Sequence, residues 1–329
     1  MEGKGEGGEE RKGGLILGHH YGKITRKTVY LQNKKPIDMK YLDPKADLTF
    51  KKVFGSQPDV VISFLNALLP FEEGREIKEI EYLNPEMVPE NPLRKHSIVD
   101  VRCKDSLGRH FIVEMQMVWS PEFKQRVLFN ASKAYVRQLD SGEDYELLQP
   151  VYSLNLVNDI FEPGLPETYY HYYRLVHVEH TEKVIDGLHL VFVELPKFTP
   201  HTYTEKKMQV LWLRYLTEIN EHTQEVSPEL MAHPEIRKAV NALEESAFSQ
   251  EQLLGYEKFW DIVSVEKTLF NSGERKGFEK GRAEGREEGK AEGREEEKYA
   301  IALKMRQQGI DSQIIAQCTG FAPEEIEAL

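Results

Sequence analysis

Acidic and amide side chains interrupt two otherwise apolar segments in the stretch SIVDVRCKDSLGRHFIVEMQMV, which spans residues 97–118. Asp100 lies in the first segment, and Glu114 and Gln116 lie in the second. A charged group that leaves water costs free energy unless it is paired or holds a metal ion. Two carboxyl groups and an amide in such positions are therefore candidates for binding a cation and for the chemistry that a bound cation supports.

The two segments are predicted to form a β-hairpin. Their polar connection, KDSLGR, contains the Asp, Ser and Gly that are typical of hairpin turns. Side chains alternate between the two faces of a strand, so an unbroken first strand puts Asp100 on the face of Ile98 and Arg102. A hairpin that is symmetric about Leu107 makes Asp100 and Glu114 direct cross-strand partners, with Cβ atoms about 5 Å apart.

Two carboxylates placed this close together repel each other. Like charges directly opposite one another destabilise a sheet, and one of the two carboxyl groups would retain its proton. A divalent cation removes the conflict, and Mg²⁺ is commonly held by one or two carboxylates while it leaves room for a substrate phosphate. A slip of one residue in the register would put the acids on opposite faces. The pattern alone favours a simpler interpretation, a half-exposed hairpin with its acids on the wet face.

Further elements must position this hairpin. Apolar residues at helical spacing predict helices over residues 47–54, 59–69 and 121–139. Strands are expected over residues 75–83, 151–157, 169–178 and 189–195. This order of elements indicates an α/β fold in which helices pack on a mixed sheet.

Composition limits the class of protein. The net charge of −12 gives no support for a nucleic-acid partner, because an overall basic footprint is the usual sign of one. The cysteines, Cys103 and Cys318, indicate a reducing compartment without a disulfide framework or a zinc cluster. No apolar run approaches the roughly 18 residues of a membrane helix, and the first residues lack the apolar segment of a signal peptide. We expect a cytoplasmic protein with no membrane partner.

The chain divides into regions of different composition. Residues 1–38 are rich in Gly, Lys and Glu and are expected to be disordered. The folded domain is expected over 39–200, followed by a helical region over 201–270. Residues 271–298 form a Gly/Glu/Arg-rich repeat that reads as a helix or a spacer, and 299–329 resemble a short helix-turn-helix element.

The repeat places a glycine at every fourth position from Gly273 to Gly293. Each interior glycine costs a helix about 1 kcal/mol relative to alanine, and Glu–Arg and Glu–Lys pairs four residues apart partly compensate. The pattern favours a solvated, marginal helix or a flexible spacer. The alternative is close helix–helix packing along the glycine stripe.

Several motifs occur in a distinctive order between residues 39 and 198. They are DLTFKKVFG, FLNALL, VDVRCKDSLGRHFIVEMQM, FKQRVLFNASKAYVRQLDSGEDYELLQPV and FVELPKF. With them the chain resembles the metal-dependent PD-(D/E)XK nuclease superfamily, whose signature is an acid in one strand and Glu-x-Lys in the next. More narrowly, it resembles the Rpn group of recombination-promoting nucleases, also described as PD-(D/E)XK nuclease family transposases.

The resemblance implies a restriction-endonuclease-like PD-(D/E)XK core, a mixed sheet flanked by helices, with a helical C-terminal extension. It implies Asp100 and Glu114 as ligands of Mg²⁺ (or Mn²⁺), with the backbone carbonyl of Met115 as a third ligand. Gln116 stands where the wider superfamily has its lysine, and glutamine is usual in the narrower group. An amide orients a water molecule or a phosphate but brings no charge.

Another cation is therefore expected near the site. Lys51, Lys52 and Arg126 are candidates on the flanking helices, and Asp47 is a candidate outer acid or second metal ligand. Each has a structural alternative. The three basic residues can be solvated charges on helix faces, and Asp47 can be the N-cap of the helix that follows it.

Together these features predict a metal-dependent DNA endonuclease that is associated with recombination or transposition, with a dimer as a possible assembly for double-strand cleavage. The alternative is a catalytically weak or inactive relative that binds nucleic acid or oligomerises. The absence of a lysine at position 116 and the net charge of −12 favour this alternative. The sequence also leaves open the use of the same site on RNA.

Overall fold

The computed structural model describes residues 40–87, 97–200 and 207–328, so the tail expected over residues 1–38 lies outside the described residues. The strands are β1 Ile80–Tyr82, β2 Glu86–Met87, β3 Ser97–Ile98, β4 Val101–Asp105, β5 His110–Gln116, β6 Val151–Val157, β7 Tyr170–Val176 and β8 Val184–Glu194. The α-helices are α1 Asp47–Phe54, α2 Pro58–Leu68, α3 Phe123–Val136, α4 Lys207–Glu218, α5 Pro228–Met231, α6 Pro234–Asn241, α7 Gln250–Gln307, α8 Ser312–Thr319 and α9 Pro323–Ala328. Single 3-10 turns occur at η1 Tyr145–Leu147, η2 Leu195–Lys197 and η3 Glu245–Ala247.

The centre of the fold is a mixed sheet of six strands in the order β1-β4-β5-β6-β8-β7. Strands β5, β6 and β8 are parallel to one another, while β1, β4 and β7 pair in antiparallel fashion at the two sides. Two parallel neighbours need a crossover connection, which α3 provides between β5 and β6. The predicted α/β class and the mixed sheet are confirmed.

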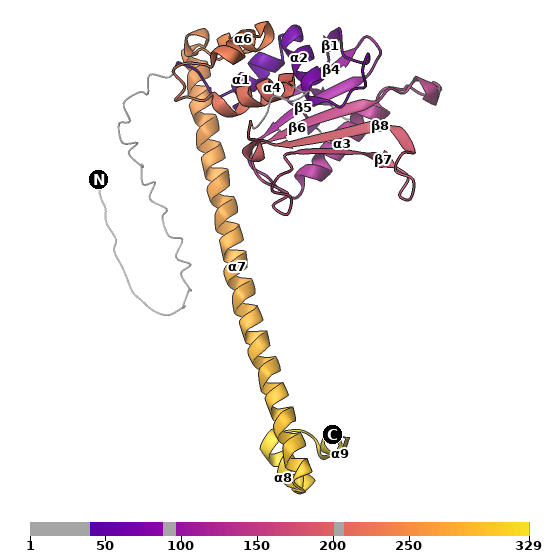
Figure 1. Ribbon diagram of the computed structural model, residues 1–329, viewed down its shortest axis with the longest axis vertical. Helices are drawn as coiled ribbons and strands as arrows, with labels where there is room; N and C mark the ends of the chain where they lie inside the picture. Colours follow the sequence, from indigo (N-terminus) through magenta and orange to yellow (C-terminus); the bar gives the residue numbers. More distant parts are fainter. Residues whose placement is uncertain (1–39, 88–96, 201–206, 329) are drawn as a thin grey trace, which may run out of the picture. The chain divides into compact units, whose positions relative to one another are not determined.

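Helices cover both faces of this sheet. Figure 1 shows α3 on one face, opposite α1, α2 and α4 on the other. The larger core lies on the side of α1, α2, α4 and α6, where Phe54 packs on Phe64 with ring centroids 4.5 Å apart. The smaller core joins α3 to the sheet through Ala131, Ala134 and Ile112. Because β6 is covered on both faces, six of its seven residues are buried, which explains its nearly continuous apolar sequence.

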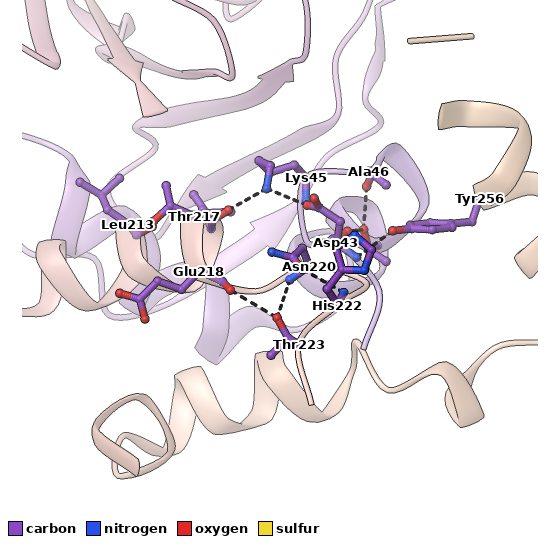
Figure 2. A network of polar contacts seen from close by, with 12 residues as sticks. Asp43, Lys45, Ala46, Leu213, Thr217, Glu218, Asn220, His222, Thr223 and Tyr256 are labelled. Carbon is purple, nitrogen blue, oxygen red and sulfur yellow. Dashed lines mark hydrogen bonds and ion pairs between the residues drawn. The ribbon is translucent and has the colours of Figure 1, made fainter. Parts of the chain in front are cut away.

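A buried polar network holds the chain that enters α1 (Figure 2). The N–H of Asp43 donates to the hydroxyl of Tyr256 on α7 at 2.9 Å, and Asp43 accepts the N–H of Lys45 at 2.8 Å. The ammonium group of Lys45 bonds the carbonyl of Leu216 at the end of α4 at 3.0 Å. This network and the apolar contacts around Tyr256 tie α1, α4 and the start of α7 together. It therefore fixes where α7 leaves the domain.

Helix α7 is continuous from Gln250 to Gln307 and includes the glycine repeat. Its N-terminus has a capping box, in which Ser249 and Gln252 satisfy each other's backbone N–H groups. Only the first turns are buried against the domain, and a Cβ added at each repeat glycine from Gly273 to Gly293 would meet nothing within 4 Å. In the described chain the stripe is thus open, with no helix packed along it.

The end of α7 packs with α8 and α9 through Ala302, Ile315 and Ile326. The turn after α8 contains Gly320 at φ 82°, a left-handed conformation that glycine adopts without a steric penalty. Across the described residues, no helix has both the length and the apolar character to span a membrane.

Candidate functional site

The register of the hairpin brings the two predicted acids into line. Strand β4 pairs with β5 so that Val101 lies opposite Val113 and Cys103 lies opposite Phe111. Continued by one residue, this register aligns Asp100 with Glu114. The predicted symmetry about Leu107 is therefore confirmed, although the paired ladder ends at Val101.

The expectation of one unbroken first strand is wrong. The chain leaves regular strand geometry at Val99 and Asp100, between β3 and β4. Val99 packs with Met87 and Ile112 on the α3 side, whereas Val101 belongs to the opposite core. The N–H of Val99 also donates to the carbonyl of Pro85 at 3.2 Å, so this part of the chain bonds away from β5.

Asp100 fills the gap that this break leaves in the ladder. Its Oδ2 accepts the backbone N–H of Met115 at 2.8 Å. In a continued antiparallel ladder, the acceptor for that N–H would be the carbonyl of Val99. A side-chain carboxylate thus replaces a main-chain acceptor, and this bond holds Asp100 against the edge of β5.

Glu114 lies on the face of β5 that α3 covers. Its side chain is buried, and its Oε1 accepts a hydrogen bond from Nδ2 of Asn130 at 2.9 Å. In the described part of the chain this is its one side-chain hydrogen bond, so Oε2 is available to a ligand. Ile112, Glu114 and Gln116 share this face of β5, since all of them contact α3.

The electrostatic state of the two acids reflects their burial and their proximity. The pKa of Glu114 is raised from 4.5 to about 7, mainly by burial, while the hydrogen bond from Asn130 opposes the shift and the charge of Asp100 adds to it. Burial also raises the pKa of Asp100, and the hydrogen bond from Met115 and the charge of Lys51 partly oppose this. The site thus holds negative charge at a free-energy cost that a bound cation would offset.

The predicted cations occupy three different places. Nη2 of Arg126 donates to Oε1 of Gln116 at 2.5 Å, which places a guanidinium group beside the side chain of Gln116. Nζ of Lys51 lies 3.9 Å from Oδ1 of Asp100. Lys52 instead donates to the carbonyl of Ala247 at 2.6 Å, with its ammonium group over the ring of Phe248, away from the two carboxyls.

Asp47 is the first residue of α1, and Ala46 is the N-cap. The alternative interpretation of Asp47 as a helix cap is therefore wrong. Its Oδ1 bonds Nζ of Lys51 at 2.6 Å, and its charge is one of the causes that raise the pKa of Asp100. Asp47 thus lies at the outer edge of the acid pair and shares Lys51 with it.

The donor set suits a hard divalent cation. Two carboxylates come from Asp100 and Glu114, and a strand residue points its N–H and C=O to the same side, so the carbonyl of Met115 faces the side of Asp100. Oxygen donors of this kind are what Mg²⁺ and Mn²⁺ prefer. Within residues 40–87, 97–200 and 207–328 no group of three or more His, Cys, Asp or Glu side chains is placed to hold a metal. A metal here would depend on the backbone carbonyl and water for its remaining ligands.

Asn130 is the site residue that sequence reasoning missed. It is almost fully buried, and its Oδ1 has no hydrogen-bond partner among the described residues. The available signal was helical spacing, because Arg126 and Asn130 are four residues apart and lie on the same face of α3.

A mixed sheet with helices on both faces, and an acid pair aligned where the β4–β5 pairing ends, is consistent with the class of metal-dependent nuclease folds. The family model described as "PD-(D/E)XK nuclease family transposase" matches residues 44–264. The chain belongs to this family, whose nucleases generally use divalent metals, and a nuclease- or transposase-related function follows. No curated protein and no solved structure shows significant similarity to the chain.

Proposed function

We propose that this chain is a Mg²⁺-dependent DNA endonuclease, with Mn²⁺ as an alternative ion, that hydrolyses phosphodiester bonds in recombination or transposition. The observation that carries the proposal is the alignment of Asp100 with Glu114 across the β4–β5 hairpin, where each carboxyl has a raised pKa. Family membership supports a nuclease reaction, and the transposase description of the family supports DNA as the substrate.

In this proposal Asp100, Glu114 and the carbonyl of Met115 hold the metal. When bound, such a metal polarises the scissile phosphate and lowers the pKa of a water molecule that attacks phosphorus. Met115 N–H and Asn130 keep the two carboxylates in place through bonds of 2.8 and 2.9 Å, so the ligands are positioned before the metal arrives.

Gln116 acts by positioning a charge. Its Oε1 accepts from Arg126 at 2.5 Å and its Nε2 donates to the carbonyl of Val118 at 2.6 Å, so both ends of the amide are engaged. A guanidinium group has five N–H donors and suits phosphate oxygens. Arg126 supplies the positive charge that the lysine supplies in the wider superfamily, and it stabilises the charge that develops on the phosphate in the transition state.

The test uses supercoiled plasmid, because a closed circle has no end from which an exonuclease could start. Purified protein should relax the plasmid in the presence of Mg²⁺ and leave it intact with a chelator. Asp100→Asn and Glu114→Gln should each abolish relaxation. Glu81→Gln, which removes an exposed acid from the edge strand β1, is the matched control and should keep the activity. Undiminished relaxation by the Asp100 and Glu114 variants would remove these residues from the mechanism.

A second candidate function is nucleic-acid binding or oligomerisation without cleavage. Gln116 in place of lysine and the net charge of −12 favour it. Calorimetric titration with Mg²⁺ separates the two functions, because the nuclease requires binding that disappears when both Asp100 and Glu114 are replaced. Parallel digestion of DNA and RNA strands of one sequence then identifies the substrate.

A further inference from the structure

A cavity of about 440 Å³ lies where β5 and β6 end and α7 passes the domain. Its wall on the sheet side is formed by residues that directly follow these two strands, among them Trp119 and Phe161. Its other wall is α7, through Lys267, Phe270, Asn271 and Glu274. Cavities of this volume hold small organic groups, and the carboxyl ends of parallel strands are the usual place for ligands in α/β sheets.

The position of α7 at this cavity is fixed by packing. Val263 is buried against Met117 and Val118, which follow β5. Lys267 is one turn further along the helix and Phe270 is about one turn beyond it, so both face the end of the sheet. The residues that α7 contributes all lie past residue 264, where the match to the family model ends. This wall therefore lies outside the part of the chain that the family model matches.

Aromatic rings give the cavity flat surfaces. Trp119 stacks on Phe161 with centroids 4.4 Å apart and planes 20° from parallel. Phe270 lines the same cavity and is 42% exposed, so its ring is accessible to a ligand. A cavity lined by aromatic rings favours a flat ring as the occupant, because aromatic groups attract one another in offset-stacked and edge-to-face arrangements.

Polar groups without partners line the same space. In the described part of the chain, the indole N–H of Trp119, the amide of Asn271 and the ammonium group of Lys267 make no hydrogen bond or ion pair. Asp159 is held at the rim, where its carboxylate accepts the backbone N–H groups of Trp119 at 3.0 Å and Ile160 at 2.9 Å. Donors and acceptors next to stacked rings are what the edge of a nucleobase requires.

The cavity is adjacent to the candidate catalytic residues. Gln116 bonds the carbonyl of Val118, which lines the cavity, at 2.6 Å. Arg126 lies over the ring of Phe123 at 4.8 Å, and Phe123 meets Trp119 edge to face at 5.7 Å. A strand whose phosphate reaches Arg126 would therefore have a neighbouring base within reach of Trp119.

We infer that this cavity binds one unpaired nucleobase of the DNA strand, next to the phosphodiester bond that is cut. The base stacks against Trp119 and Phe270, and Asn271 and Asp159 bond its edge. Lys267 neutralises a neighbouring phosphate. The inference rests on the proposed nuclease function for its substrate, and it predicts that single-stranded or locally unpaired DNA binds better than a perfect duplex.

Binding of a short labelled DNA strand to the full chain is measured by fluorescence anisotropy in the presence of a chelator, so that no cleavage is needed. The single strand is compared with its perfect duplex, with a duplex that contains one unpaired base, and with a strand that carries an abasic site. We expect the single strand and the duplex with an unpaired base to bind better than the perfect duplex. An abasic site at the right position should weaken binding about 5- to 100-fold, as for loss of one base–aromatic stack.

Two phenylalanines of α7 provide a matched pair of variants. Phe270→Ala removes a wall of the cavity, whereas Phe278→Ala removes a ring that is 70% exposed outside it. Both side chains lie on the helix surface, so both variants should fold. Phe270→Ala should weaken binding of the single strand to the same degree as the abasic site, and Phe278→Ala should leave it unchanged.

Equal binding of single strand and duplex, or equal effects of the two variants, would overturn the inference. If the protein cleaves plasmid but shows no preference for an unpaired base, the proposed nuclease function stands and only the proposed nucleobase site is rejected. If single-strand binding depends on Phe270 but the protein cleaves no DNA, the proposed nucleobase site stands and the proposed nuclease function is rejected.

Discussion

The carboxylate of Asp100 accepts the backbone N–H of Met115 at 2.8 Å, where a regular ladder would present the carbonyl of Val99. One side chain therefore ends the β4–β5 pairing and at the same time lies beside Glu114. Asp100 has a structural role in addition to its proposed role as a metal ligand, and substitutions can separate the two.

Asp100→Asn should fold as the parent does but lose cleavage, because the amide oxygen still accepts the N–H of Met115 while the charge for the metal is gone. Asp100→Ala removes the acceptor as well and should lower the free energy of unfolding by about 1–2 kcal/mol. Urea denaturation of both variants measures this difference. Equal stability of the two would show that the bond to Met115 contributes little.

Glu114→Gln should stabilise the metal-free protein at neutral and higher pH. The pKa of Glu114 is raised from 4.5 to about 7, so the folded state keeps a proton that the unfolded state releases. The contribution of Glu114 to the free energy of unfolding is therefore greatest below the pKa of 4.5 that it has in the unfolded state, and it is lost as the pH rises toward the folded-state pKa of about 7. The neutral glutamine avoids this loss, which is at most about 3 kcal/mol at about pH 8.

Denaturation of the parent and of Glu114→Gln across the pH range checks this prediction. The difference in unfolding free energy should be small at about pH 4 and should grow toward about pH 8. Other buried acids, such as Asp43, whose pKa burial also raises, are common to both proteins and cancel in the comparison. A difference that does not vary with pH would mean that Glu114 titrates normally.

Binding of Mg²⁺ should depend on pH through the same carboxyl group. The metal requires the ionised form of Glu114, so its apparent affinity should fall about tenfold for each pH unit below about 7. Calorimetry in buffers of different ionisation enthalpy measures the affinity and the proton released on binding. Affinity that stays constant between about pH 5 and 8 would place the metal elsewhere.

Arg126→Ala should slow plasmid cleavage about 100-fold, the size of effect expected when one group that stabilises transition-state charge is lost. Adding Gln116→Lys to this variant returns a positive charge to β5 and should recover part of the rate. Lys52→Ala is the control, because its ammonium group bonds Ala247 rather than the acid pair. The measurement is the initial rate of plasmid relaxation at saturating Mg²⁺. If Gln116→Lys recovers none of the rate, a lysine at position 116 and Arg126 do not play the same role.

Alanine substitutions at Gly281, Gly285 and Gly289 test the two interpretations of the repeat. Since nothing lies within 4 Å of a Cβ added there, each alanine should stabilise α7 locally by about 1 kcal/mol. Hydrogen exchange of the α7 amides reports the gain in local opening free energy. Loss of protection or of a dimer in the alanine variant would instead indicate that the glycines pack against a second helix.

Local rules account for what the sequence determined by itself. The turn residues and the two-residue period of the strands predicted a hairpin symmetric about Leu107, and the pairing of Val101 with Val113 agrees. The apolar run over residues 151–157 predicted a strand, and β6 occupies these residues. These features depend on residues that are close in the chain, so one sequence is sufficient to read them.

Tertiary structure decided the rest, because periodicity does not specify where a strand stops or which helix covers it. The break at Val99 depends on an acceptor in Pro85, and the partner of Glu114 is Asn130 on a helix that folds back over β5. The packing of the helices also decides that Arg126, and not Lys52, bonds Gln116. The cavity beside Trp119 exists only because α7, far along the chain, is held against the end of the sheet.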